Sequence, residues 1–485
     1  MEHQADKSQG FLLGFEELAQ AVGGRAWSAL PGGAPAGVSI DSRTTRPGDL
    51  YVAIAGERFD GHDFIGQALQ AGACGAVVSR PGPFPADKVF LEVQDTRLAL
   101  LGLAAAFRRK WGGRLICVTG SAGKTTTKEW IASILSVDEA VHTSRGNFNN
   151  EIGLSLTLLA LRPECRRAVV EIGMNHAGEI SALAAAAAPD VGVLTCVAPV
   201  HLEFFTSLEA IADAKAEMIP FLPGNGCLVY NADDPLLGSR AATYPGTRIS
   251  FGTSESADVR ATEIRSRGLD GSELLVSWQG ETVPAACPLP GKHNIYNLLA
   301  AVAVAAAEGR PLERIVQAGR REPAVYHRGA RLRFADGFTV IDDSYNSNPR
   351  ALEFMLGLIG ETTGYRRKVV VAGEMKELGS GSEEWHRQAG RCAARSGAEL
   401  LLGVQGQARF LLEGAREAGM AVARTLWAEN AAEAADRLMA ELRPGDLVLI
   451  KGSRGVALDQ VVARLKAAYA LEGAESASGK ECPAC

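Results

Sequence analysis

The feature that most constrains the fold of this chain is a short loop that reads Thr119-Gly120-Ser121-Ala122-Gly123-Lys124-Thr125. The apolar run before it, 115–119, predicts a buried strand, and the pattern after it, 124–135, predicts a helix. Glycines let a backbone curl until its N–H groups point at phosphate oxygens, and the N-terminus of the following helix adds partial positive charge. A strand, such a loop and a helix in this order indicate an α/β fold that binds a nucleotide.

The side chains at the end of the loop have the chemistry for phosphate and metal. Lys124 would neutralise the β- and γ-phosphates of ATP, and the hydroxyl of Thr125 would complete the coordination of Mg²⁺. The general phosphate-loop pattern has glycine five residues before Gly123, where this chain has Val118. Gly-Lys-Thr alone also occurs in loops without a ligand. The predicted nucleotide-binding residues here are Gly120, Ser121, Ala122, Gly123, Lys124, Thr125 and Thr126.

Strands and helices alternate through most of the remaining chain, which predicts parallel sheets with helices on both faces. A length of 485 residues exceeds what one hydrophobic core usually serves, so two or three domains are expected. We predict three α/β domains: a small N-terminal domain, a central phosphate-loop domain with a parallel sheet, and a Rossmann-like C-terminal domain. Their predicted bounds are 11–110, 111–317 and 318–470, followed by a disordered tail, 471–485.

Charge and hydropathy argue against two classes of partner. The net charge of −6 is opposite to the basic surface of a nucleic-acid binder, although it is compatible with a local phosphate site. The most apolar stretch, 298–307, is about half of what spans a bilayer, and the N-terminus lacks the pattern of a signal peptide. Nine scattered cysteines indicate reduced thiols. The sequence therefore predicts a cytoplasmic protein with no membrane insertion and no nucleic-acid partner.

The loop, in the form Thr-Gly-x-x-Gly-Lys-Thr, resembles that of the Mur ligase family, and further segments resemble the family in the same order. In the central part they are Gly146-Asn147-Phe148-Asn149-Asn150, Glu171-Ile172-Gly173-Met174-Asn175-His176, His201-Leu202-Glu203, Asp213-Ala214-Lys215-Ala216-Glu217 and Gly291-Lys292-His293-Asn294-Ile295-Tyr296-Asn297. After these come Asp342-Asp343-Ser344-Tyr345-Asn346-Ser347-Asn348-Pro349, Gly373-Glu374-Met375-Lys376-Glu377-Leu378-Gly379 and Lys451-Gly452-Ser453-Arg454. The resemblance covers nearly the whole chain.

The resemblance implies an ATP-dependent acid–D-amino-acid ligase of peptidoglycan synthesis, which activates a carboxylate as an acyl phosphate before an amine attacks it. The strings from Asp342 onward are similar to the family member that joins UDP-N-acetylmuramoyl-tripeptide to D-alanyl-D-alanine (D-Ala-D-Ala), the last cytoplasmic step towards UDP-MurNAc-pentapeptide. These small molecules are the expected substrates, 11–110 is the expected UDP-muramoyl-peptide-binding domain, and a monomer is expected. The alternative is the preceding ligase, which adds the third amino acid. Its Asp-Asn-Pro-Arg signature is absent, because Ser347-Asn348-Pro349-Arg350 lacks the aspartate.

The resemblance also assigns roles around the phosphates. Thr125, Glu171 and His201 are implied as ligands of Mg²⁺, of which two ions are expected. Lys215 is implied as a carbamate, an anion that helps to hold the second ion, and the implied catalytic residues are Lys124, His201 and Lys215. From the residues alone, Lys215 is typical of a solvated helix face, Glu171 of a solvent-facing strand end and His201 of a structural hydrogen bond.

The remaining assignments concern the nucleotide and the two substrates. The implied ATP contacts are Asn294, Asn297, Arg328, Asp343 and Tyr345, with helix capping as the alternative for Asn294. The implied substrate contacts are Ser42 and Arg43 for the uridine diphosphate, Asn149 and Asn150 for the muramoyl-peptide, and Lys451, Ser453 and Arg454 for D-Ala-D-Ala. One departure lies at Tyr326-His327-Arg328, where this subfamily more often has Pro-Gly-Arg.

Three other functions also use a phosphate loop. A folate polyglutamate or cyanophycin-type ligase shares the loop, but the UDP-binding segment around Asp41-Ser42-Arg43 argues against it. A phosphate-loop switch without ligase activity would not need every metal and carbamate position. A kinase is disfavoured by Val118 in the loop.

Overall fold

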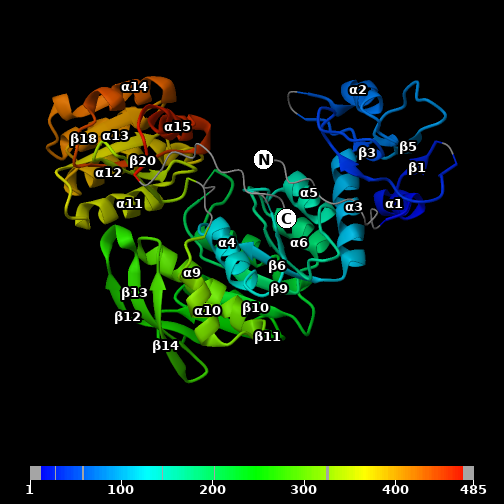
Figure 1. Cartoon of the computed structure of the whole chain (residues 1–485), viewed down its shortest axis with the longest axis horizontal. Helices are drawn as coiled ribbons and strands as arrows, with labels where there is room; N and C mark the ends of the chain where they lie inside the picture. The colour runs from blue at the N-terminus through cyan, green and yellow to red at the C-terminus, as the bar shows by residue number, and fades with distance from the viewer. Residues whose placement is uncertain are drawn as a thin grey trace, which may run out of the picture. The chain divides into compact units, whose positions relative to one another are not determined.

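The computed structural model describes residues 13–27, 29–56, 59–144, 146–200, 203–323 and 327–472 (Figure 1). The chain divides into two compact units, and each is considered by itself. The first unit comprises 1–197, 211–257 and 300–310. The second unit comprises 198–210, 258–299 and 311–485.

The N-terminal part of the first unit is a small sheet with short helices. Its strand order is β1-β5-β4-β3-β2, parallel except for the pairing of β1 with β5. Tyr51, Val77 and Phe90 are among the side chains of its core. The elements are α1 (Phe15–Val22), β1 (Arg25–Ala26), β2 (Gly37–Ser39), β3 (Asp49–Val52), α2 (Ile65–Gln70), β4 (Gly75–Val78) and β5 (Val89–Glu92).

The helix α3 (Thr96–Trp111) follows this sheet and packs on α5 and α6 (Figure 1). The carboxylate of Asp95 caps its first turn, and Gly112 ends it with a φ of 70°, which glycine adopts without strain. The guanidinium of Arg108 lies 2.9 Å from the Asp190 carboxylate, which fixes α3 on the central part of the unit. The sequence pattern over 98–110 predicts an amphipathic helix, and α3 contains this range.

The central part of the first unit is a sheet of parallel strands in the order β7-β8-β6-β9-β10-β11. Residues 115–118 of β6 are fully buried, as expected for a parallel strand with helices on both faces. The elements are β6 (Arg114–Thr119), α4 (Lys124–Leu135), β7 (Val141–Thr143), α5 (Glu151–Leu159), β8 (Arg167–Glu171), α6 (Glu179–Ala187), β9 (Val191–Leu194), α7 (Leu208–Ala216), β10 (Cys227–Asn231), α8 (Pro235–Ala241) and β11 (Thr247–Gly252).

The second unit begins with an antiparallel arrangement that the sequence did not predict. Strand β12 (Val259–Ser266) pairs with β13 (Ser272–Trp278), which pairs with β14 (Glu281–Cys287). Helices α9 (Lys292–Ala307) and α10 (Leu312–Gly319) follow, and part of α9 belongs to the first unit. Pro284 lies within β14, and proline is confined to edge strands because it donates no ladder hydrogen bond.

A Rossmann-like sheet forms the rest of the second unit, in the order β15-β16-β20-β17-β18-β19. All neighbours are parallel except β15, which pairs antiparallel with β16. One apolar cluster packs α11, α12 and α13 on the sheet, and a second packs α14 and α15. The elements are β15 (Ala330–Arg333), β16 (Thr339–Asp343), α11 (Pro349–Glu361), β17 (Arg367–Gly373), α12 (Ser382–Arg395), β18 (Leu400–Val404), α13 (Ala408–Glu417), β19 (Thr425–Ala428), α14 (Ala431–Glu441), β20 (Asp446–Lys451) and α15 (Asp459–Ala468).

The α/β class predicted from the sequence is confirmed, and the predicted tail starts slightly too early. Leu471 forms a bridge with Phe334, and the amide of Glu472 donates to the carbonyl of Arg333 at 2.9 Å. Residues 473–485 lie outside the described part of the chain. Among the helices that the structure describes, none combines the length and the apolar character needed to cross a membrane.

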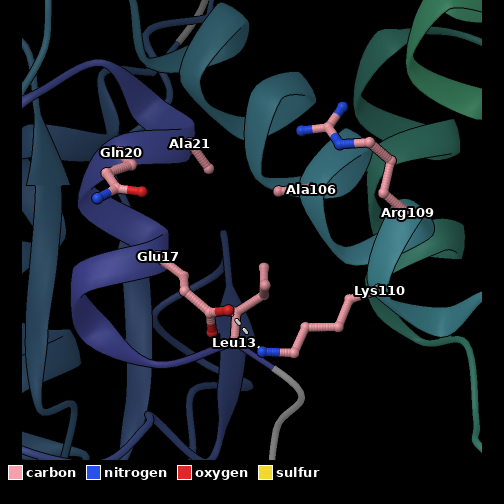
Figure 2. Close-up of a pocket in the computed structure, with 7 residues that line it drawn as sticks. All are labelled: Leu13, Glu17, Gln20, Ala21, Ala106, Arg109 and Lys110. Carbon is pink, nitrogen blue, oxygen red and sulfur yellow. Dashed lines mark hydrogen bonds and ion pairs between the residues drawn. The ribbon is translucent and has the colours of Figure 1, made fainter.

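A pocket of about 460 Å³ lies between α1 and α3, and Figure 2 shows its lining. It contains none of the predicted site residues. Its walls carry an exposed ion pair, in which Nζ of Lys110 donates to Glu17 at 2.5 Å. The lining residues are Leu13, Glu17, Gln20, Ala21, Ala106, Arg109 and Lys110.

Candidate functional site

The loop between β6 and α4 has the curled backbone that the sequence predicted. Gly123 precedes α4 with a φ of 80°, and Gly120 has a φ of 149°. A Cβ on Gly120 would lie 1.8 Å from Oγ1 of Thr195, so no larger residue fits there. The same Oγ1 donates to the carbonyl of Ala122 at 2.6 Å. The loop is therefore fixed at the N-terminus of α4, where backbone N–H groups lack helical partners and can bind an anion.

A lysine bends over this loop. Nζ of Lys124 donates to the carbonyl of Gly120 at 2.8 Å. The amide of Ser121 donates to the carbonyl of Cys196, also at 2.8 Å, which ties the loop to the segment after β9. Thr126 is buried in the first turn of α4. The loop thus combines a cation with a helix N-terminus, the two features that favour a polyphosphate.

The carboxylate of Glu171, at the end of β8, joins the loop to a second segment. Oγ1 of Thr125 donates to its Oε2 at 2.5 Å, and Nδ2 of Asn149 donates to its Oε1 at 2.6 Å. Glu171 is only 1% exposed, so both of its oxygens are held by these two side chains. The alternative of a solvent-facing strand end is wrong for Glu171.

The donor atoms beside the loop fit Mg²⁺. Thr125 and Glu171 supply adjacent oxygens, and Mg²⁺ is commonly held by one or two protein oxygens with phosphate and water completing the octahedron. Among the residues that the structure describes, no group of three His, Cys, Asp or Glu side chains could hold a metal. The predicted ligand His201 lies outside the described residues.

Lys215 is buried on α7, although its position on a helix face is typical of a solvated lysine. Its exposed fraction is 2%. Burial, with the positive charge of Lys124 as the second cause, lowers the pKa of Lys215 to about 7. An ε-amine with this pKa is largely neutral slightly above pH 7, and a neutral amine is nucleophilic. The interpretation as a surface lysine is therefore wrong.

The other predicted substrate residues of the first unit already have partners. Asn150 caps α5, because its Oδ1 accepts from the amide of Gly153 at 2.9 Å. Oγ of Ser42 donates to Gln67 at 2.9 Å, and Ser42 is buried. The side chain of Arg43 is 80% exposed and lies 2.6 Å from Asp41. Their assignment to substrates stays a prediction.

In the second unit, five predicted residues meet where β16 and β20 end. Nζ of Lys451 donates to Oδ2 of Asp343 at 2.6 Å. Burial raises the pKa of the Asp343 carboxyl, and Lys451 opposes this rise. Two cations lie near the ring of Tyr345, with Cζ of Arg328 at 4.1 Å and that of Arg454 at 5.5 Å from its centroid. These side chains form one polar cluster at the carboxyl edge of a parallel sheet, where α/β proteins bind ligands.

Ser453, Asn294 and Asn297 are also buried in the second unit. Oγ of Ser453 accepts from the amide of Lys376 at 3.0 Å. Nδ2 of Asn294 donates to the carbonyl of Pro290 at 2.8 Å, and Nδ2 of Asn297 donates to Asn294 at 3.0 Å. Asn294 lies inside the first turn of α9, which begins at Lys292, so helix capping is not its role.

The sequence reasoning missed two buried polar residues next to the predicted ones. Lys128 is fully buried on α4, one turn beyond Lys124. Asp342, 2% exposed, lies 2.7 Å from Nδ1 of His327 and accepts from the hydroxyl of Ser344 at 2.6 Å. A signal for Lys128 existed, because it lies four residues after Lys124 and so on the same helix face.

Three family models match successive parts of the chain. They are described as "Mur ligase family, catalytic domain" over residues 35–108, "Mur ligase middle domain" over 118–305 and "Mur ligase, glutamate ligase domain" over 327–454. UDP-N-acetylmuramoyl-tripeptide–D-alanyl-D-alanine ligase of Escherichia coli is 37% identical over 436 residues, which are 88% of this chain and 93% of that protein.

Solved structures show the same relationship. MurF from Acinetobacter baumannii is 32% identical and has a TM-score of 0.84, with 93% of this chain and 98% of that chain covered. MurF ligase from Thermotoga maritima in complex with ADP is 27% identical and has a TM-score of 0.76, with 89% and 97% covered. The three-domain α/β architecture agrees with these matches, and the chain belongs to the Mur ligase family.

Proposed function

We propose that this protein is an ATP-dependent ligase that joins UDP-N-acetylmuramoyl-tripeptide to D-Ala-D-Ala in peptidoglycan synthesis. The observation that carries the proposal is the set of buried contacts among Thr125, Glu171 and Asn149 beside a phosphate loop. They bring a nucleotide-binding element and a predicted donor-substrate residue to one carboxylate. The name of the E. coli relative and the ADP complex of the T. maritima relative support the same function.

The proposed reaction has two steps. The terminal carboxylate of the tripeptide attacks the γ-phosphorus of ATP, which forms an acyl phosphate and releases ADP. The amine of D-Ala-D-Ala then attacks the acyl carbon, and phosphate leaves as the amide bond forms. Phosphoryl transfer depends on positioning and charge neutralisation, which Lys124 and the loop amides are arranged to supply.

Magnesium and a modified lysine belong to the proposal. Thr125 and Glu171 would hold one of two Mg²⁺ ions, which would neutralise charge on the transferred phosphoryl group. The neutral amine of Lys215 can add to CO₂ and lose a proton, which gives a carbamate. This change replaces a buried cation beside Lys124 with an anion and removes the repulsion between the two lysines. His201 is the proposed third metal ligand.

The substrates and ATP would use the remaining predicted residues. For the donor substrate we propose Ser42, Arg43, Asn149 and Asn150. For ATP we propose the loop residues with Asn294, Asn297, Arg328, Asp343 and Tyr345. For D-Ala-D-Ala we propose Lys451, Ser453 and Arg454.

The test is phosphate release with ATP, Mg²⁺ and UDP-N-acetylmuramoyl-tripeptide, with and without D-Ala-D-Ala. Release that requires the dipeptide, with a UDP-pentapeptide product of the matching mass, would support the proposal. Turnover with a UDP-dipeptide and a diamino acid instead would favour the preceding ligase of the pathway. Release with neither pair would refute ligase activity of this kind.

The carbamate has a separate test in Lys215→Ala. Short carboxylates are small enough to occupy the space left by the deleted side chain, so they should restore part of the activity. Full activity of Lys215→Ala without any added carboxylate would refute the role of the modified lysine.

A further inference from the structure

The fully buried Lys128 has no role in the reaction proposed above. Its ammonium group donates to the carbonyl of Ser144 at 2.5 Å and to that of Gly146 at 3.3 Å. Oε1 of Glu129 lies 2.8 Å from the same nitrogen. Burial of an ammonium group is unfavourable unless each N–H has an acceptor, and these three oxygens match its three hydrogens. The side chain therefore joins α4 to residues 144 and 146, which follow β7; the segment 144–150 denotes its described residues, 144 and 146–150.

The segment 144–150 connects β7 to α5 and carries the predicted donor-substrate residues at its end. The amide of Asn149 donates to the carbonyl of Asn147 at 2.7 Å, which closes a tight turn. The carbonyl of Asn149 accepts from the amide of Gly173 at 2.8 Å, while its side chain donates to Glu171. The far end of the segment is thus fixed on β8 and the residues after it, and Lys128 fixes the near end.

Close packing also fixes the far end of the segment, next to α5. A Cβ on Gly153 would lie 2.6 Å from Cα of Phe148, so the first turn of α5 contacts the segment backbone directly. At the near end, the amide of Ser144 donates to the carbonyl of Val169 at 3.3 Å, and the carbonyls of Ser144 and Gly146 accept from Lys128. Loss of the ammonium would leave two carbonyl groups beside an apolar helix face without their donor.

We propose that Lys128 is a positioning residue that holds the segment 144–150 in the conformation that presents Asn149 to the donor substrate. In this role Lys128 acts through the backbone carbonyls that it binds. The proposal rests on the proposed function for the identity of that substrate. Because Lys124 and Lys128 lie on the same face of α4, the helix that begins at the phosphate loop also sets the position of the donor-substrate residues.

The experiment compares Lys128→Met with the unchanged protein. Methionine has a similar length and no donor, so it should raise the KM for UDP-N-acetylmuramoyl-tripeptide by about tenfold or more, the scale of lost charged hydrogen bonds. The affinity for ATP, measured by direct binding, should change by less than about twofold, because the loop residues remain in place. Hydrogen exchange should show faster exchange of the amides of 144–150 without any substrate.

Lys110→Met is the matched control. Lys110 is 44% exposed and its partner is Glu17 on α1, far along the sequence from 144–150 (Figure 2). This variant removes the same charge and should leave the KM values and the exchange of 144–150 unchanged. If Lys128→Met does not fold, Lys128→Gln replaces it, because the shorter amide cannot reach both carbonyls. The same result is then expected: a higher KM for the tripeptide and a nearly unchanged affinity for ATP.

Two results would overturn the role of Lys128. One is an unchanged KM for the tripeptide in a folded variant. The other is an equal loss of ATP affinity and tripeptide binding, which would indicate a general structural defect. Absence of turnover in the unchanged protein would instead refute the proposed function, and the hydrogen exchange of 144–150 would still decide whether Lys128 orders the segment.

Discussion

Replacement of Lys215 by methionine should stabilise the protein while it abolishes ligase activity. Methionine fills a similar volume and carries no charge, so it removes the cost of a buried ammonium group. The pKa of Lys215 is lowered from 10.5 to about 7 by burial and by Lys124. A shift of this size corresponds to a cost of about 5 kcal/mol for the protonated lysine in the folded state.

The cost of burying the protonated Lys215 decreases as the pH rises. The folded-state pKa lies below the unfolded one, so between pH 7 and 10.5 the unfolded chain binds more protons than the folded chain. The free energy of unfolding of the unchanged protein should therefore rise with pH in this window, by about 1.4 kcal/mol per unit from this group. The advantage of Lys215→Met should be about 4 kcal/mol near pH 7 and about 2 kcal/mol near pH 9.

The assay is urea unfolding of both proteins at several pH values between 7 and 9 in buffers free of CO₂. A pH-independent difference in unfolding free energy between the two proteins would refute the account of Lys215 as a lysine forced towards neutrality. A destabilised methionine variant at pH 7 would refute it as well. In a second series with bicarbonate, the unchanged protein should gain stability and Lys215→Met should not, because only the lysine can bind CO₂.

Three further predictions concern other buried polar groups. Glu308→Leu should lower the unfolding free energy in urea by about 1 kcal/mol, because Arg114 and Arg167, now 3.0 and 2.7 Å from that carboxylate, lose their shared partner while Arg167 keeps Glu139. An unchanged urea midpoint would contradict this. His327, with a φ of 59°, has a left-handed backbone and binds Asp342, so both His327→Gly and His327→Ala lose the contact but only alanine keeps the strain. His327→Ala should therefore be less stable than His327→Gly by about 1 kcal/mol, and equal urea midpoints would rule out backbone strain at this position. Burial lowers the pKa of His386, whose Nε2 accepts from the amide of Met375 at 2.9 Å, so its contribution is complete above about pH 6.5 and is lost as the pH falls. In thermal unfolding between pH 7 and 5, His386→Gln should show a weaker dependence on pH than the unchanged protein, and identical slopes would count against this assignment.

The sequence by itself determined the local chemistry. The helix predicted over 124–135 matches α4, and the strand before it matches β6 within one residue, because an apolar run, a glycine loop and a helical period lie next to one another in the chain. The sequence pattern over 349–359 likewise predicts a helix, and α11 begins at the same residue, since Asn348 caps it and Pro349 occupies its first turn. Such signals need only neighbouring residues.

The strands β12 to β14 escaped prediction for a physical reason. The exposure of β12 alternates only in its first half, so its sequence lacks the two-residue period of a half-buried strand. β14 contains a proline, which argues against a strand in a sequence-based prediction. Their pairing with one another through β13 supplies the hydrogen bonds that the sequence pattern did not indicate.

Only the tertiary structure decided which polar side chains are buried. Lys128 and Lys215 have sequences around them that are typical of exposed helix faces, yet both are buried, and Glu171 is enclosed at the end of β8. The order β7-β8-β6-β9 places β8 beside β6. Glu171 at the end of β8 therefore meets Thr125, on the helix that follows β6, and Asn149, in the loop between β7 and α5. Contacts among residues 20 to 50 positions apart depend on strand order, and strand order is set by the packing of the whole sheet rather than by any local pattern.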